Sequence, residues 1–447
     1  MKTFYSKSLL SLVFTAIIAF LFVLFFVSGC KEQDPLRKGR IQIEYWELWT
    51  GFEYQAMKDL VDKFNRSQDE IYVKMLSISQ IDRKILISTA GGVPPDIAGL
   101  MPGFIPQFAD KNALEPLDPL MDIIGVKKED YIDIYWQLGN YNGTQYALPS
   151  TPAVLALHYN KDILRSVGLD PENPPQTIEE LDAMAEKMMV KRDELNYDRL
   201  GFIQTSPGWW NYAWVYFFGG KWFDGENITA NCPENIRAFE WIESYAKKYG
   251  SRQLQNFTGG FTSPNFDSAE NPFFAERLGM VFQGVWLSNF IDKYNPDMDW
   301  AITSFPSEGG RLKDSVMAEC NLLVIPKGAK HRIEAAKFLG FIQKPENLQY
   351  LALKHTKFIP LKLANDIDYT DHPNPHIKEF VRLAQSENIF SVPWIPIWTE
   401  MDGEISNALQ AVWLQKMTAR EVLDHAQERL EDKWDEYKRI KKAIEKQ

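Results

Sequence analysis

The segment TSPGWWNYAWVYFFGGKWFD, residues 205–224, holds four tryptophans: Trp209, Trp210, Trp214 and Trp222. An indole ring has a flat apolar face on which a ligand can stack. Indole rings also pack well in a buried core. The residue types alone therefore leave two roles open for this segment, a ligand platform and an ordinary buried helix.

The position of the segment separates its two ends. Residues 200–204, LGFIQ, read as a strand, and Ser206 and Pro207 are favourable first residues of a helix. We therefore expect Trp209 and Trp210 in the first helical turn after a strand, at the edge where open α/β sheets bind ligands. Trp209 is the candidate platform, and Trp210 is a candidate for either role. The later aromatic residues are expected in the core: Trp214, Phe217 and Phe218.

Motifs of the common enzyme classes are missing from the sequence, among them G-x-x-x-x-G-K-[ST], G-x-G-x-x-G, G-x-S-x-G and H-E-x-x-H. His372 and His376 flank Pro-Asn-Pro, which is not a usual metal-ligand spacing, and are interpreted as loop residues. Three acidic residues occupy alternate positions near the C-terminus: Glu400, Asp402 and Glu404. A glycosidase needs two carboxylates on opposite sides of a cleft. We interpret the three residues as part of a solvent-exposed face rather than as catalytic groups. We expect no catalytic residue, metal or cofactor, and the pattern favours a binding protein over an enzyme.

The charge balance and the N-terminus restrict the location of the protein. A net charge of −11 without a basic cluster argues against a nucleic-acid surface.

Lys2 and Lys7 precede an apolar run over residues 9–27, which ends in Ser-Gly-Cys30. This pattern resembles a bacterial lipoprotein signal, with residues 1–29 removed, Cys30 lipidated and residues 30–40 as a tether. An uncleaved membrane anchor is the alternative, and either one places the chain outside the cytoplasmic membrane. Lipidation would anchor it to the cell membrane on the extracytoplasmic side of a bacterium.

Two further cysteines, Cys232 and Cys320, lie far apart in the sequence. An exported protein could pair them in a disulfide, but their spacing does not require it. Paired and unpaired thiols are equally compatible with the sequence.

The alternation of strand and helix patterns predicts an α/β protein. Strand patterns at residues 41–46, 71–78 and 96–100 alternate with helical spacing of apolar residues, and the alternation restarts after Tyr146. The 447 residues are too many for one typical core and indicate two lobes. We expect each lobe to contain a mostly parallel sheet covered by helices. Capping boxes that begin with Thr177 and Thr418 mark two helix starts.

Several segments occur in the order typical of one family, notably YALPSTPAVLALHYNKDIL at residues 146–164 and MVFQGVW at residues 280–286. With YWELWTGFE, GGVPPDIAGL, FFGGKWF, NLLVIPKGAK and KFIP, nearly the whole mature chain resembles family 1 extracellular solute-binding proteins. These are the maltodextrin-binding type that serves sugar ABC importers.

The resemblance implies a type II periplasmic-binding-protein-like fold with a ligand cleft between two lobes. Residues 41–151 plus 313–344 would form the N-terminal lobe, and residues 152–312 plus 345–447 the C-terminal lobe. The chain would cross between the lobes near Thr151, Lys313 and Lys344. The protein would act as a monomer and deliver its ligand to permease subunits, with the ATPase on a separate chain.

The resemblance also implies which residues hold the ligand. An indole after a strand forms part of the sugar floor in the family, and here it is Trp286 in Gly-Val-Trp. Other aromatic positions correspond to Trp209 and to Trp394 or Trp398. Residues after the first strand line the opposing lobe: Trp49, Thr50 and Glu53. A sugar ring stacks its C–H face on an indole while its hydroxyl groups hydrogen-bond to carboxylates or amides.

Two departures from the family affect the expected ligand. Glu319 lies in Ala-Glu-Cys, where the family often has a glycine pair, and is either a hydrogen-bond acceptor in the cleft or a loop residue. Residues 100–103 replace acidic and aromatic contacts of the N-terminal lobe, so maltose itself is in doubt. The expected ligand is a mono- or oligosaccharide, while polyols and glycerol phosphates remain open and no basic cluster indicates phosphate. A membrane-anchored carbohydrate-active enzyme or a surface adhesin is the alternative function.

Overall fold

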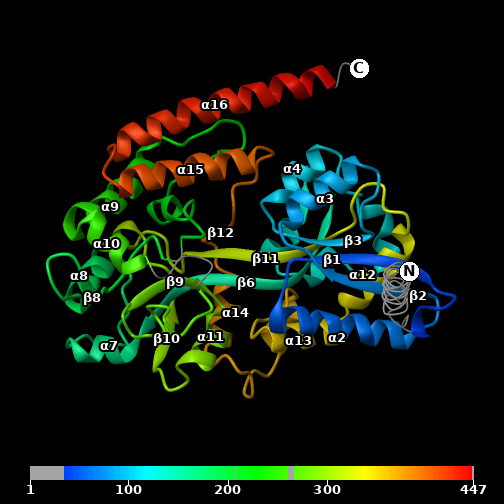
Figure 1. The fold of residues 1–447 in the computed structure, drawn as a ribbon, viewed down its shortest axis with the longest axis horizontal. Helices are drawn as coiled ribbons and strands as arrows, with labels where there is room; N and C mark the ends of the chain where they lie inside the picture. The colour runs from blue at the N-terminus through cyan, green and yellow to red at the C-terminus, as the bar shows by residue number, and fades with distance from the viewer. Residues whose placement is uncertain (1–34, 207, 260–265, 445–447) are drawn as a thin grey trace, which may run out of the picture.

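The computed structural model describes residues 35–206, 208–259 and 266–444. The predicted signal peptide, Cys30, most of the tether and Pro207 lie outside the described residues. Figure 1 shows two helix-covered lobes joined through the long strands β6 and β11. These strands belong to one eight-stranded sheet in the order β10-β6-β11-β3-β1-β2, with β12 on β11 and β9 on β6.

The first lobe contains the parallel part of the sheet. Strand β1 (Ile41–Glu47) pairs in parallel with β2 (Ile71–Ser77) and with β3 (Ile97–Leu100). Helix α2 (Gly51–Ser67) connects β1 to β2, because parallel neighbours need a crossover. Its apolar positions, spaced as a helix requires, are all buried as expected: Ala56, Met57, Leu60, Val61 and Phe64.

The directions of the strands that pair with β6 differ from the prediction. Strand β6 (Ala147–Asn160) is antiparallel to β11 (Val316–Val324), β9 (Met280–Gly284) and β10 (Trp300–Thr303). The expectation of a mostly parallel sheet in each lobe is therefore wrong for the second lobe. The physical reason is that β6 runs through both lobes, so later strands return along it in the opposite direction. Every residue of β6 is buried, which explains its almost continuous apolar sequence.

The remaining elements complete the helical layers on the sheet. The short strands are β4 (Asn140–Tyr141), β5 (Thr144–Gln145), β7 (Val190–Lys191), β8 (Tyr197–Arg199) and β12 (Ile389–Phe390). The other α-helices are α3 (Ile81–Ala90), α4 (Phe104–Asp110), α5 (Met121–Ile124), α6 (Asp133–Gln137), α7 (Lys161–Ser166), α8 (Ile178–Met188), α9 (Pro233–Tyr249), α10 (Ser251–Thr258), α11 (Leu287–Tyr294), α12 (Arg332–Ile342), α13 (Pro345–Lys354), α14 (Ile377–Leu383), α15 (Trp398–Trp413) and α16 (Ala419–Ile444).

Both predicted capping boxes are confirmed. At the start of α8, the Thr177 hydroxyl accepts from the Glu180 amide, and the Glu180 carboxylate accepts from the Thr177 amide. At the start of α16, Thr418 and Glu421 make the same reciprocal pair at 3.3 and 2.9 Å. These bonds satisfy amide groups that the first helical turn leaves without partners.

The tryptophan-rich segment is the clearest local error of the sequence prediction. Residues 200–204 form no extended strand and contribute an isolated bridge from Leu200 to Leu278. The helix expected from Ser206 does not form, and the first helical residues are the 3₁₀ turn Trp214–Phe218. Gly208 has a φ of +80°, which is incompatible with a helix. The core prediction is confirmed, because Trp214, Phe217 and Phe218 are buried.

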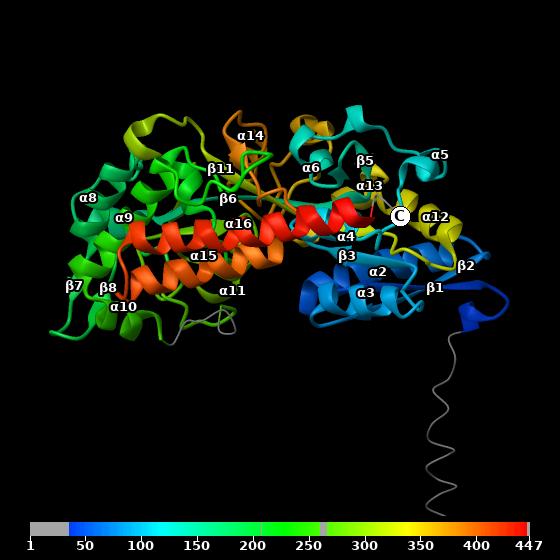
Figure 2. The same ribbon diagram turned by 90° about the horizontal axis from the view of Figure 1, so that it is seen from above.

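Helix α16 extends across both lobes. Figure 2 shows it running over α15 and past the end of α15 toward the lobe that contains β1. Its last turns meet the first lobe through an ion pair between Lys441 and Asp110. Within residues 35–206, 208–259 and 266–444, none of the helices has an apolar stretch of the length that a bilayer requires. The thiols of Cys232 and Cys320 are both free in this structure.

Candidate functional site

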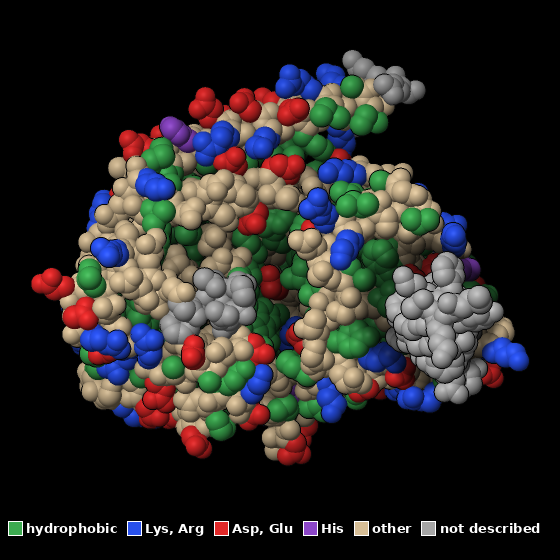
Figure 3. Space-filling view, in the orientation of Figure 1, with side chains coloured by type: hydrophobic (Ala, Val, Ile, Leu, Met, Phe, Trp, Pro, Cys, Tyr) green, Lys and Arg blue, Asp and Glu red, His purple; other side chains and the backbone are tan. Residues whose placement is uncertain are grey.

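A cavity of about 550 Å³ lies between the two lobes. The hollow at the centre of the face in Figure 3 contains hydrophobic and acidic side chains. The loops that follow β1, β3 and β9 contribute to its walls, as expected for ligand sites at the carboxyl ends of strands. Its described lining consists of Leu48, Trp49, Glu53, Met101, Pro102, Gly103, Phe104, Trp209, Trp210, Tyr212, Phe266, Trp286, Phe290, Glu319, Asn321, Lys357, Val392, Trp398 and Asp402.

The first lobe contributes residues from the turn between β1 and α2. Trp49 lines the cavity and packs edge-on against the ring of His355, with 5.0 Å between the ring centroids. Glu53, in the first turn of α2, also lines the cavity, and burial raises the pKa of its carboxyl although Lys357 opposes the shift. Thr50 is the N-cap of α2; it is exposed and is not among the lining residues.

Trp286 follows β9 in the second lobe and lines the cavity. A Cβ atom on Gly284 would lie 2.3 Å from carbons at the edge of the Trp286 ring. Glycine at this position therefore allows the indole to lie against the end of its own strand. The ring of Trp210 lies 5.9 Å from that of Trp286, at 45° between the planes. The two indoles are therefore neighbours on the cavity wall.

Trp209 and Trp210 both line the cavity, although no helix begins there. Their rings meet edge-on at 5.3 Å. The Nε1 of Trp210 donates a 2.9 Å hydrogen bond to Oε1 of Glu319. Glu319 lies in strand β11, opposite Ala153 of β6, and is therefore not a loop residue. Burial raises the pKa of Glu319, and the bond from Trp210 opposes that shift.

Trp398 is the first residue of α15 and approaches the other lobe closely. A Cβ atom on Gly103 would lie 2.4 Å from Trp398 Nε1, so the contact requires glycine. Tyr212 packs edge-on against Trp398 at 4.9 Å. Trp394, the other candidate in this segment, donates from Nε1 to the carbonyl of Asn140 at 3.0 Å and is not among the lining residues.

The acidic trio on α15 does not share one environment. Glu404 forms a 2.6 Å ion pair with Arg429. Asp402 lines the cavity, where burial raises the pKa of its carboxyl. Glu400 is exposed and lines a different hollow. The expectation of a solvated face therefore fails for Asp402, and the three carboxylates do not converge on one point.

Several cavity residues were not predicted from the sequence. Lys357 is the most unusual of them, because it is only 3% exposed and is the one basic residue among the described lining residues. A lysine is exposed by default, and its local sequence gave no sign of burial. The others are mainly apolar or amide side chains from elements that are distant in the sequence: Phe104, Tyr212, Phe266, Phe290 and Asn321.

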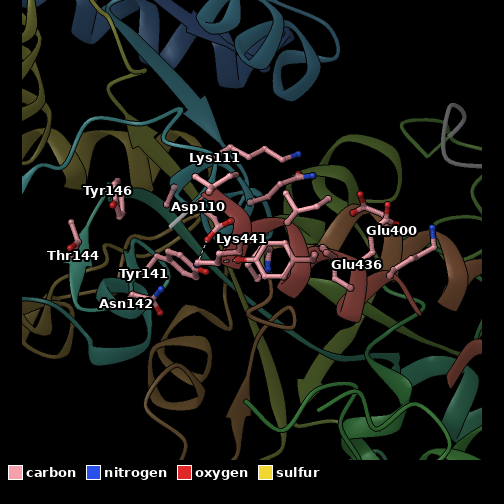
Figure 4. A pocket seen from close by; sticks show the side chains of 17 residues that line it. Asp110, Lys111, Tyr141, Asn142, Thr144, Tyr146, Glu400, Glu436 and Lys441 are labelled. Carbon is pink, nitrogen blue, oxygen red and sulfur yellow. Dashed lines mark hydrogen bonds and ion pairs between the residues drawn. The ribbon is translucent and has the colours of Figure 1, made fainter. Parts of the chain in front are cut away.

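A second hollow, of about 650 Å³, lies between α16, the start of α15 and the first lobe. Figure 4 shows Asp110, Tyr141 and Lys441 around it, with Asp110 and Lys441 joined as a pair. Of the residues that the sequence analysis weighed as candidates, it contains only Glu400. The predicted aromatic and acidic residues converge on the cavity between the lobes instead.

Two helix-covered lobes with an aromatic and acidic cavity between them define the architecture of a solute-binding protein. The family model for bacterial extracellular solute-binding proteins matches residues 59–374, and the chain belongs to this family. The resemblance found in the sequence is therefore confirmed.

Relatives and solved structures agree with this assignment. The chain is 28% identical to CpMnBP1, solved with mannotriose bound, with a TM-score of 0.78 over 87% of this chain and 99% of that one. It is 21% identical to the maltotriose-binding protein of Pyrococcus abyssi (strain GE5 / Orsay), over 83% of this chain and 78% of the relative. It is also 21% identical to the arabinooligosaccharide-binding protein of Bacillus subtilis (strain 168), over 72% of this chain and 73% of the relative.

Proposed function

We propose that this protein captures a mono- or oligosaccharide between its lobes and delivers it to the permease subunits of an ABC importer. The observation that carries the proposal is the composition of one cavity: indole rings from both lobes together with the carboxylates of Glu53, Glu319 and Asp402. Indoles offer stacking surfaces for the C–H face of a pyranose, and carboxylates accept from its hydroxyl groups. The oligosaccharides bound by the three similar proteins support this ligand class.

Closure of the two lobes would couple capture to delivery. We place the hinge in the strands that join the lobes, near Thr151 in β6 and near Lys313 before β11. The Thr151 hydroxyl donates to Oδ1 of Asn321 at 3.0 Å, which ties the two connecting strands together. A ligand that contacts both lobes favours the closed arrangement because it binds that arrangement more tightly. Permease subunits would then recognise the closed form.

Titration calorimetry of a soluble form, residues 31–447, which lacks the signal peptide and Cys30, tests the binding proposal. The titrants are mannotriose, maltotriose and arabinotriose, and chromatography afterwards determines whether the sugar is intact. We expect saturable binding of at least one sugar and recovery of that sugar unchanged. A cleaved product would instead support the carbohydrate-active enzyme, and an absence of binding to all sugars would remove carbohydrate as the ligand class.

We also propose that Cys30 carries the lipid that anchors the protein to the outer face of the cell membrane. The support is the sequence alone: an apolar run that ends in Ser-Gly-Cys, followed by a polar tether. In a bacterial host, the wild type should incorporate labelled palmitate and fractionate with membranes. The Cys30→Ala variant should not incorporate label, and equal labelling of both forms would contradict the anchor.

A further inference from the structure

Lys357 places a buried cation on the wall of the cavity. The residue is 3% exposed, and its Nζ lies 5.4 Å from the centroid of the Trp286 ring. No ion pair or hydrogen bond to this Nζ occurs among the described residues. An ammonium group has three donors, and burying one without partners is costly. The donors of Lys357 are therefore available to a molecule in the cavity.

The backbone next to Lys357 adopts an uncommon conformation. Thr356 has a φ of +51°, which is an uncommon and strained value for a β-branched residue. The Thr356 hydroxyl accepts from Ser288 at 3.1 Å, and the Lys357 carbonyl contacts Nε2 of His372 at 3.1 Å. Strain of this kind persists where the surrounding structure enforces it, and it is concentrated at functional sites.

The charges around Lys357 indicate which ligands the cavity accepts. Glu53 and Glu319 lie within electrostatic range of the ammonium, and Asp402 lines the same cavity. The cavity lining therefore contains three carboxyl groups and one amine, and a phosphate or a carboxylate on the ligand would meet net repulsion when these groups are ionised. A neutral ligand with hydroxyl groups can both accept from the lysine and donate to the carboxylates.

We propose that Lys357, together with the carboxyl groups of Glu53 and Glu319, determines the specificity of this cavity and selects an uncharged ligand with neighbouring hydroxyl groups. One hydroxyl oxygen accepts from the Lys357 ammonium, and the adjacent hydroxyl donates to Glu53 or Glu319. The position of Nζ over Trp286 means that a sugar ring stacked on this indole brings its oxygens to the lysine. This inference rests on the proposed function and extends it, because it names the groups that separate neutral sugars from anionic ones.

The test compares the mature wild type with Lys357→Met and Lys354→Met. Methionine has nearly the shape of lysine without its charge, and Lys354 is an exposed residue at the end of α13 that serves as the matched control. Calorimetry uses mannotriose, maltotriose and arabinotriose as probes, and glycerol 3-phosphate as the anionic competitor. Circular dichroism checks that both variants fold.

The expected result is affinity weaker by about tenfold or more in Lys357→Met, because hydrogen bonds to a charged donor are lost. Lys354→Met should stay within about twofold of the wild type. Glycerol 3-phosphate should not displace the sugar from the wild type. If Lys357→Met does not fold, Lys357→Gln takes its place under the same expectations.

Failure of this inference is distinguishable from failure of the proposed function. A wild type that binds none of the sugars overturns the proposed function and with it the inference. A wild type that binds sugar with the same affinity as Lys357→Met overturns only the role of Lys357. Displacement of the sugar by glycerol 3-phosphate overturns the selection for uncharged ligands.

Discussion

The Nε1 of Trp210 donates a 2.9 Å hydrogen bond to Oε1 of Glu319. Trp210 belongs to a loop of the second lobe, while Glu319 belongs to β11, one of the strands that join the lobes. The bond uses one carboxylate oxygen and leaves the other for the cavity. A charge-assisted bond of this kind fixes the direction of a side chain and also lowers the cost of its burial.

Removal of the Glu319 carboxylate should weaken sugar binding. Glu319→Ala deletes the acceptor and should weaken affinity by about tenfold or more, since hydrogen bonds to charged groups contribute about 1.5–3 kcal/mol. Trp210→Phe removes only the donor that orients it, and a smaller loss is expected. Calorimetry of both single variants and of the double variant measures their coupling. Strictly additive losses would contradict the orienting role of Trp210.

Trp286 should matter for binding and Trp394 should not. Trp286→Ala removes a stacking surface from the cavity and should weaken affinity by up to about tenfold, as expected for loss of about 0.5–1.5 kcal/mol of aromatic contact. Trp394 is outside the described lining, so Trp394→Ala should change affinity by less than about twofold. Fluorescence titration with mannotriose or maltotriose provides the comparison. Equal losses in the two variants would show that the cavity is not the ligand site.

The close contact between the Trp398 indole and residue 103 should require glycine at position 103. A Cβ atom at Gly103 would lie 2.4 Å from Trp398 Nε1, so Gly103→Ala must displace the indole or hold the lobes apart. We expect weaker sugar affinity and a larger radius of gyration in the presence of sugar than for the wild type.

Gly403 offers a matched control on the same helix as Trp398. A Cβ atom there would have no neighbour within 4 Å, and alanine should stabilise α15 by about 0.5–1 kcal/mol. Gly403→Ala should therefore raise the melting temperature and leave affinity unchanged. If Gly103→Ala binds sugar as tightly as Gly403→Ala does, the close contact is not needed for ligand capture.

Glu47 should make the protein less stable as the pH rises. Burial raises the pKa of Glu47 from 4.5 to about 7, although bonds from the Tyr45 hydroxyl and the Leu48 amide oppose the shift. The folded protein then binds more protons than the unfolded chain between these pH values, so stability falls across this window. The loss is about 3 kcal/mol, because one pKa unit corresponds to about 1.4 kcal/mol.

Comparison with Glu47→Gln isolates this effect. The pKa of His158 is lowered to about 3, and that shift makes stability rise with pH over part of the same window. Both proteins share this histidine contribution, so it cancels in the difference between them. The free energy of unfolding of Glu47→Gln relative to the wild type should rise between pH 4.5 and pH 8 by about 3 kcal/mol. A difference that is constant with pH would contradict the assignment.

Local patterns in the sequence predicted the local structure well. The spacing of apolar residues predicted helix α2. The capping box formed by Thr177 and Glu180 predicted the start of α8. The strand directions around β6 were not predicted, because an apolar strand has the same local pattern whichever way its neighbours run. The helix expected from Ser206 failed because Gly208 adopts a positive φ that the pattern does not reveal.

Only part of the candidate site was predicted, because the sequence pattern does not show which distant residues meet in the cavity. Trp49, Trp286 and Trp398 were indicated by the resemblance to the family, Trp209 was indicated by the residue pattern as well, and all four line the cavity. Lys357 was missed because its burial depends on loops that are distant in the sequence. Asp402 was interpreted as solvated, since the pattern of α15 does not show that its start faces the other lobe.

A crystal structure of the mature protein with the tightest-binding sugar of the panel tests the central claim most directly. The account predicts the sugar between the lobes, with one ring on Trp286 and hydroxyl groups within hydrogen-bond distance of Lys357 and of Glu53 or Glu319. Sugar in the hollow beside α16, or at any other place outside the cavity, would contradict it.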